Sequence, residues 1–149
     1  MKRLSFLALV ALLVLSLCGC GASSADAAIP DVPVDLDLTK LSGTVMYAQV
    51  FDMLEEPERY MGQKVRASGT FNYFRDMSTG REYFAVLIQD ATACCAQGLE
   101  FQWAGDHKFP IDYPEIDQPI IVTGTFSTYE EQGYTFVQLT DAQLEFEYL

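Results

Sequence analysis

The chain has 149 residues and a formal net charge of −12 at pH 7, from 21 acidic and 9 basic side chains. This length is enough for one ordinary domain with a hydrophobic core. A phosphate backbone would repel so acidic a chain, so the composition argues against nucleic-acid binding.

The first 20 residues have the pattern of a bacterial lipoprotein signal. Met1-Lys2-Arg3 gives a basic start, and an apolar run broken only by serines extends from Leu4 to Leu17. This run is shorter than the about 20 residues that a membrane-spanning helix needs, and its flanks fit a signal peptide. Leu17-Cys18-Gly19-Cys20 then resembles a lipobox.

The lipobox resemblance implies that residues 1–19 are removed and that the Cys20 thiol carries a diacylglyceryl group, with fatty acyl chains such as palmitate. Cys18 is the weaker candidate, because Gly19 is the better residue before the cut. A plain secretory signal would be cut at Ala25-Asp26-Ala27, but this triplet lies well beyond the apolar run. We expect an extracytoplasmic protein held at the cell membrane by lipid chains.

Residues 20–40 are expected to form a flexible, lipid-anchored tether, with the folded domain over residues 41–149. The stretch after Cys20 is rich in small and polar residues and contains two prolines, which is typical of a linker. Between Val32 and Leu38, apolar residues alternate with polar residues or proline. This alternation leaves open a short edge strand or an extended segment laid on the domain.

One helix is predicted between residues 42 and 56. Ser42 or Thr44 can cap its start, and Pro57 ends it. Apolar residues recur there at helical spacing: Met46, Tyr47, Val50, Phe51, Met53 and Leu54. We expect this stripe to pack on a sheet.

From Lys64 onward the pattern favours β-strands. Strands are predicted over residues 65–73, 83–89, 99–103, 120–126 and 133–139, and residues 144–148 form a sixth or extend the fifth. Residues 104–119 contain three prolines, so only a loop or one helical turn fits there.

The β region contains an internal repeat. Residues 65–71 (VRASGTF) match 120–126 (IIVTGTF), and 83–91 match 134–142. Each copy is predicted to be a hairpin with a glycine inside its first strand, where a bulge or tight bend is expected. Two such hairpins are what a small, sharply coiled barrel needs to close.

The strand order resembles the OB-fold, a five-stranded barrel. The resemblance covers about residues 45–140 and includes the lead-in helix and the Pro57-x-x-Tyr60-x-Gly62-x-Lys64-Val65 stretch. That stretch is similar to one in small OB-like lipoproteins of uncharacterised function in Gram-positive bacteria. The resemblance implies a mainly β protein, an OB-like small barrel of five to six strands with one N-terminal helix. The chain departs from it at residues 104–119, where OB-folds usually have a helix.

The adjacent pair Cys94-Cys95 is the feature of the predicted domain most suggestive of chemistry. With the following Ala96 it resembles a Cys-Cys-Ala segment in the OB-like C-terminal domain of a permease-associated bacterial family placed near metal homeostasis. That family has an acidic residue shortly after the pair, where this chain has Gln97 and Gly98.

Three interpretations of the pair stay open: two small buried hydrophobes in a turn, a vicinal disulfide, or a thiophilic metal site. A zinc ion would take Cys94 and Cys95, with His107 as third ligand and Asp90 or Asp106 as fourth. Copper(I) would take the two thiolates and a thioether, for which the candidates are Met53, Met61 and Met77. His107 is otherwise a solvated loop residue.

The sequence has no Ser-His-Asp set, phosphate-binding glycine loop or paired acid and base that would indicate an enzyme. Tyr73, Tyr83 and Trp103 are candidates for stacking on a ligand, although core packing also explains Trp103. The leading hypothesis is a non-catalytic domain that binds a small ligand or an envelope protein. The alternative is metal binding or thiol redox chemistry through Cys94 and Cys95.

Overall fold

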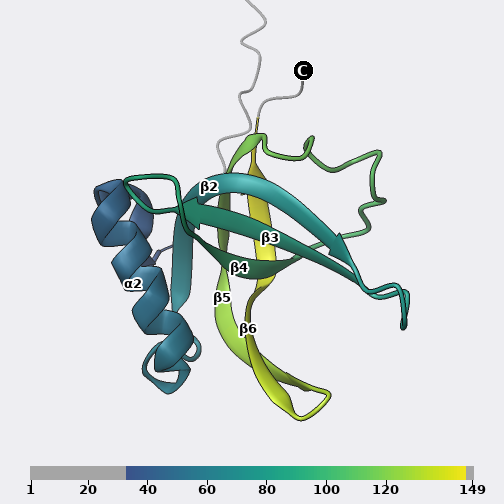
Figure 1. Cartoon of the computed structure of the whole chain (residues 1–149), viewed down its shortest axis with the longest axis horizontal. Coiled ribbons are helices and arrows are strands. Elements are labelled where there is room, and N and C mark those ends of the chain that lie inside the picture. Colours follow the sequence, from purple (N-terminus) through teal and green to yellow (C-terminus); the bar gives the residue numbers. More distant parts are fainter. Residues whose placement is uncertain (1–32, 147–149) are drawn as a thin grey trace, which may run out of the picture. The chain divides into compact units, whose positions relative to one another are not determined.

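The computed structural model describes residues 33–146, so the expected signal segment and Cys20 lie outside the described residues. Figure 1 shows the path of the chain. The elements are β1 (Leu36–Asp37), the 3-10 helix η2 (Leu38–Lys40), α2 (Gly43–Glu55), the 3-10 helix η3 (Pro57–Arg59), β2 (Lys64–Arg75), β3 (Glu82–Gln89), β4 (Ala96–Trp103), β5 (Pro119–Glu131) and β6 (Tyr134–Glu145).

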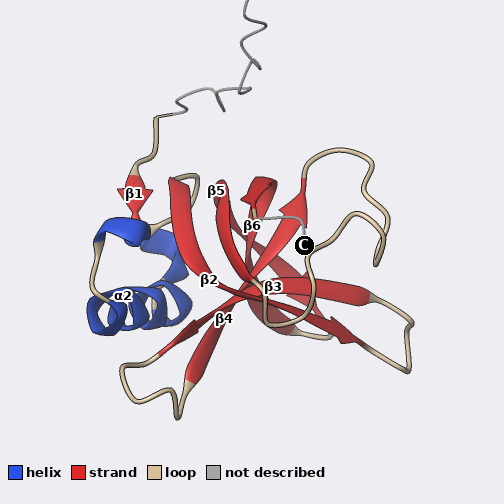
Figure 2. Ribbon diagram, turned by 90° about the horizontal axis from the view of Figure 1, so that it is seen from above, coloured by secondary structure: helices blue, strands red, loops and turns tan. Residues whose placement is uncertain are grey.

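The fold is mainly β, with six strands in one mixed sheet and five of them in a ring. The strand order is β1-β2-β3-β4-β6-β5, and β5 pairs in turn with β2. The pairs β1–β2 and β4–β6 are parallel, and the other pairs are antiparallel. Figure 2 shows α2 beside the strands, and Figure 1 shows the β5–β6 hairpin extending beyond them.

The predicted helix is confirmed as α2, which has Ser42 as its N-cap residue and ends before Pro57. Val50 and Met53 are fully buried in the core. Phe51 is 49% exposed, so the buried face is narrower than the apolar stripe of the sequence. One turn of a helix can bury only the side chains that face the sheet, and Phe51 lies about 100° around the axis from Val50.

The strand predictions are confirmed, and one alternative is decided. β6 continues without a break from Tyr134 to Glu145, so the last predicted strand extends the fifth. Residues 104–118 connect β4 to β5 without a helix, as the three prolines indicated.

The glycines of the repeat allow two close backbone approaches. A Cβ atom on Gly69 would lie 2.2 Å from the carbonyl oxygen of Leu87, and one on Gly124 would lie 2.9 Å from Cβ of Leu139. The β5–β6 register also shifts next to Gly124, between Thr123 and Thr125. These positions need glycine because a side chain would push the paired strand away.

The folded unit begins before residue 41, the residue at which the folded domain is expected to start. The backbone N–H of Asp35 donates to the carbonyl of Lys64, and Leu36 pairs with Val65. Leu38 is fully buried. Residues 35–40 therefore lie on the domain as a short edge strand and a helical turn, because the alternating apolar side chains find a buried face there.

Candidate functional site

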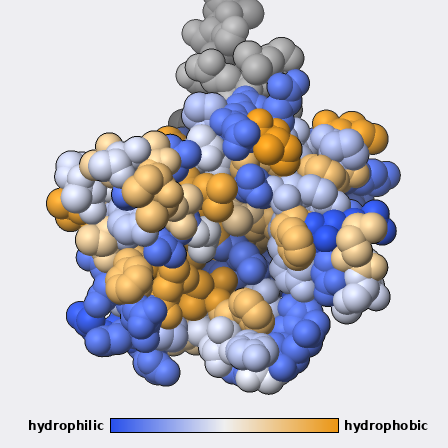
Figure 3. Space-filling view, viewed as in Figure 1, coloured by the Kyte–Doolittle hydropathy of each residue, from blue (hydrophilic) through white to orange (hydrophobic). Residues whose placement is uncertain are grey.

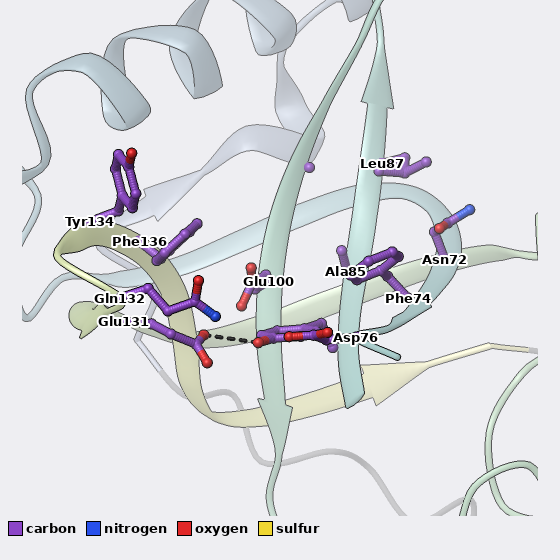
Figure 4. Close-up of a pocket in the computed structure, with 12 residues that line it drawn as sticks. Asn72, Phe74, Asp76, Ala85, Leu87, Glu100, Glu131, Gln132, Tyr134 and Phe136 are labelled. Carbon is purple, nitrogen blue, oxygen red and sulfur yellow. Dashed lines mark hydrogen bonds between the residues drawn. The ribbon is translucent and has the colours of Figure 1, made fainter. Parts of the chain in front are cut away.

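A groove of about 410 Å³ lies on the outer face of β3 and β4. Its floor is formed by small and apolar residues, Ala85, Leu87 and Gly98. Successive strand residues point to opposite faces, so these three face outward while Val86 and Leu99 are buried in the core. In Figure 4 the side chains of the β5–β6 hairpin lie on one side of the groove and those of β2 and β3 on the other, with Glu100 between them.

Aromatic side chains rise around this floor. Phe74 is 64% exposed, Tyr134 70% and Phe136 38%. Phe136 also stacks on Tyr129 with ring centroids 5.5 Å apart, which supports it from behind. Figure 3 shows apolar surface broken up by hydrophilic residues on the face seen in Figure 1. Exposed aromatic side chains beside a concave surface are typical of a contact site for a ligand or partner.

A polar network joins the two sides of the groove. The Tyr83 hydroxyl donates to Oε2 of Glu131 over 2.9 Å, and Nη1 of Arg81 lies 2.9 Å from Oε1 of the same carboxylate. The Arg81 guanidinium also lies 5.2 Å from the ring centroid of Tyr83 and 5.1 Å from that of Tyr129. These contacts link the β2–β3 turn to the β5–β6 hairpin and hold the wall of the groove in one arrangement.

Glu100 places a carboxyl group in the floor of the groove. Burial raises the pKa of Glu100, and the hydrogen bond that it accepts from the Tyr129 hydroxyl, 2.7 Å long, acts in the opposite direction. Burial and the neighbouring Glu100 raise the pKa of Tyr129. A ligand that donates a hydrogen bond or carries positive charge would therefore stabilise the ionised form of Glu100.

The three predicted stacking residues do not gather in this groove. Tyr83 lines it, whereas Tyr73 stacks on Phe109 at 4.2 Å between centroids and Trp103 stacks on His107 at 3.6 Å. Tyr83 and Trp103 do line a smaller cavity of about 250 Å³. Both Tyr73 and Trp103 pack against the core.

The β3–β4 turn brings Asp90, Cys94 and Cys95 together. The two sulfur atoms are 3.6 Å apart and unbonded, and Sγ of Cys94 lies 3.4 Å from Oδ2 of Asp90. Burial raises the pKa of Asp90, but hydrogen bonds from Thr92 and the cysteines outweigh it and leave that pKa lowered. The hydrogen bond with Cys94 raises the pKa of Cys95. Both cysteines are exposed, so the interpretation as buried hydrophobes is wrong.

His107 is not part of this cluster. Within residues 33–146, the group whose potential metal-ligand atoms lie within 4.8 Å of one another is Asp90, Cys94 and Cys95. His107 instead stacks on Trp103, and its Nε2 lies 3.0 Å from the Ala104 carbonyl oxygen. Of the methionines proposed for copper(I), Met53 is fully buried in the core, whereas Met61 and Met77 are 47% and 89% exposed.

Several residues of the groove were not found from the sequence. Glu100 lies between the buried residues Leu99 and Phe101 on β4. This alternation is a signal in the sequence that places Glu100 on the outer face. Its partner Tyr129 lies on β5, and the Arg81–Glu131 pair joins the β2–β3 turn to the end of β5. The sequence carries no signal for these pairings.

No family model, curated protein or solved structure matches the chain. In residues 33–146, no helix has the length and apolar character needed to cross a bilayer.

The geometry of the groove suits binding better than chemical reaction. Its acidic groups Glu100 and Glu131 are engaged with tyrosine hydroxyls and an arginine, Asp76 accepts hydrogen bonds from Ser78 and Thr79, and the floor is apolar. Such a surface can hold a ligand by apolar contact and a few directed hydrogen bonds.

Proposed function

We propose that the chain is a lipid-anchored extracytoplasmic lipoprotein whose domain is a non-catalytic, OB-like binding module. The anchor is proposed from the lipobox pattern that ends at Cys20. Under this proposal the domain holds a small ligand or an envelope protein close to the membrane.

The OB-like barrel is supported by the order of the strands in the ring. β2, β3 and β4 are consecutive antiparallel neighbours, β6 pairs in parallel with β4, and β5 closes the ring on β2. OB-folds bind ligands on the face of their second and third strands, between two loops. Here the matching face is that of β3 and β4.

The observation that carries the binding function is the groove on that face. It has an apolar floor, exposed aromatic walls and the half-buried carboxyl group of Glu100. Its chemistry favours a ligand with an apolar face and a hydrogen-bond donor or positive charge.

Site-specific photocross-linking in the cells that make the protein tests this function. A photoreactive phenylalanine at position 74 or 136 is expected to capture a ligand or partner from the envelope. The matched control is position 51, because Phe51 is 49% exposed but lies on α2, away from the groove. Equal capture at all three positions, or none at positions 74 and 136, would reject the groove as the binding site.

The lipid anchor has a separate test. Cys20→Ser is expected to abolish incorporation of a labelled fatty acid and to release the protein from the membrane fraction. Cys18→Ser is the matched control and is expected to leave both unchanged. Labelling that survives in the Cys20→Ser variant would overturn the anchor.

A metal-binding or thiol-redox role of Cys94 and Cys95 is the second candidate function. The observation in its favour is the convergence of two free thiols and a carboxylate in one exposed turn.

A further inference from the structure

Two of the three distances within the Asp90 cluster match those of a tetrahedral zinc site, and the third, between Asp90 and Cys95, lies within 4.8 Å. With zinc–sulfur bonds of about 2.3 Å, a tetrahedral angle separates two thiolates by about 3.8 Å. The sulfur atoms of Cys94 and Cys95 are 3.6 Å apart. A carboxylate oxygen and a thiolate on the same ion would be about 3.6 Å apart, and Oδ2 of Asp90 lies 3.4 Å from Sγ of Cys94.

The turn holds these three groups in place without the ion. Oδ1 of Asp90 accepts the backbone N–H of Cys94 over 3.0 Å and that of Thr92 over 3.2 Å. The backbone N–H of Asp90 donates to the carbonyl of Cys95 over 3.0 Å, which closes the loop. Oδ2 is the Asp90 oxygen within 3.4 Å of Sγ of Cys94, and it also accepts the Thr92 hydroxyl over 3.0 Å, a bond that gives way when the oxygen binds an ion.

The donor set selects among thiophilic ions. Two thiolates and one carboxylate suit zinc, which accepts both sulfur and oxygen ligands. Copper(I) prefers soft ligands alone, and the hard carboxylate of Asp90 offers it little. Copper(I) held in line between the two thiolates would also need the sulfur atoms to be separated by twice the copper–sulfur bond length, which is more than the 3.6 Å between them here.

We propose that Asp90, Cys94 and Cys95 form a three-ligand zinc site with its fourth position open to water or to a ligand atom from a partner. Each thiol releases its proton to solvent as its sulfur–zinc bond forms. The inference rests on the second candidate function and names its metal and ligands. It is independent of the groove on β3 and β4.

Cobalt(II), which reports on thiolate ligands by its absorption, is the probe for this site. The full chain is extracted in detergent under reducing, anaerobic conditions without metal-affinity resin, and cobalt is titrated in. We expect one equivalent to bind with a thiolate-to-cobalt charge-transfer band, and zinc to displace it. No band despite free thiols at Cys94 and Cys95 would overturn the proposal.

Variants assign the ligands. Cys94→Ser with Cys95→Ser is expected to abolish the band, and a band that survives would mean that the cobalt is bound elsewhere. Asp90→Asn keeps an amide oxygen for the backbone N–H groups but loses the carboxylate. Loss of a residue that only hydrogen-bonds to a metal ligand already weakens metal binding by about 10–100-fold. Loss of a direct ligand should therefore weaken cobalt binding by at least about ten-fold. Unchanged affinity would overturn the assignment of Asp90.

His107→Ala is the matched control, because His107 lies outside the cluster. It is expected to keep full cobalt affinity, and loss of binding in this variant would overturn the three-ligand site. Photocross-linking at positions 74 and 136 should be unchanged by the double cysteine variant, so failure of the zinc site and failure of the groove are distinguishable.

Discussion

The hydroxyl group of Tyr83 on β3 donates a 2.9 Å hydrogen bond to Glu131 at the end of β5, 48 residues further along the chain. This bond joins the floor strand of the groove to the hairpin that forms its opposite wall (Figure 4). Glu131 also pairs with Arg81, two residues before Tyr83, so its carboxylate holds the start of β3 at two points.

Tyr83→Phe should lower the free energy of unfolding by about 1 kcal/mol, less than a fully buried hydrogen bond to a carboxylate contributes because this pair is only partly buried. The ring and its contact with Arg81 are kept, so the change is confined to the hydroxyl group. Urea denaturation measures the effect. Tyr134→Phe serves as the control because Tyr134 is 70% exposed, and it should change stability by less than about 0.5 kcal/mol.

Glu100→Gln should stabilise the protein at neutral pH. Burial raises the pKa of Glu100 above its ordinary value of 4.5, so the folded state binds its proton more tightly than the unfolded state does. Stability of the natural protein therefore falls as the pH rises from 4.5 through the raised pKa. The glutamine variant lacks this penalty and can still accept the Tyr129 hydroxyl. Thermal melting should show a more stable Glu100→Gln variant at pH 8 and little difference from the natural protein at pH 4. A variant that gains stability at pH 4 and not at pH 8 would contradict this account.

Asp76→Asn should reveal a pH dependence of the opposite sign. Hydrogen bonds from Ser78, then from Thr79, lower the pKa of Asp76 from 3.8 to about 2. The stability that its carboxylate contributes is present above pH 3.8 and is lost as the pH falls through 2. Denaturation curves should show that the Asp76→Asn variant is less stable than the natural protein at neutral pH. The two proteins should become equally stable as the pH falls through 2. Asp106→Asn, in the exposed β4–β5 connection, controls for the loss of charge.

Gly69→Ala should destabilise the protein by about 1–3 kcal/mol or more. The added Cβ atom would lie 2.2 Å from the Leu87 carbonyl oxygen, and that backbone cannot yield without separating β2 from β3. Gly98→Ala is the matched control, since its Cβ would first meet the end of the Leu87 side chain at 3.3 Å. Equal stability losses in the two variants, measured by urea denaturation, would contradict this account.

Leu38→Ala tests whether residues 35–40 belong to the domain. Leu38 is fully buried, so the substitution should cost about 2–5 kcal/mol. Val45→Ala, at a position 51% exposed, should cost far less. A Leu38→Ala protein as stable as the natural one would restore the tether boundary at residue 41.

Much of the fold could be predicted from the sequence because its signals are local. Ser42 stands at the N-cap position of α2 without a capping hydrogen bond from its side chain, Pro57 follows the helix, and two-residue alternation marks the strands. The repeated glycines Gly69 and Gly124 predicted two sharply bent hairpins, and both glycines lie where backbones come close. The linker composition before residue 41 does not show that Leu38 is fully buried, whereas the alternation of apolar residues up to Leu38 left open a segment laid on the domain.

The groove was harder to predict because its parts come from strands far apart in the chain. Tyr83 is visible in the sequence as an aromatic residue on a predicted strand, but its partner Glu131 is 48 residues away at the end of β5. The cluster at Cys94 and Cys95 was visible because its ligands are close in sequence. The imidazole of His107 has the chemistry of a metal ligand, but its stacking contact with Trp103 holds it away from the cluster.

The closure of the ring between β2 and β5 also limits when this protein can fold. Lys64 pairs with Thr125, so an early strand must wait for a partner about 60 residues behind it. Such long-range pairing slows folding, because the chain between the partners must first be brought together. A chain that becomes available from its N-terminus onward can form α2 and the first hairpin, but it cannot complete its ring until β5 has followed. The unpaired edge of β2 is exposed throughout that interval, and it is there that we expect a chaperone to bind or aggregation to begin.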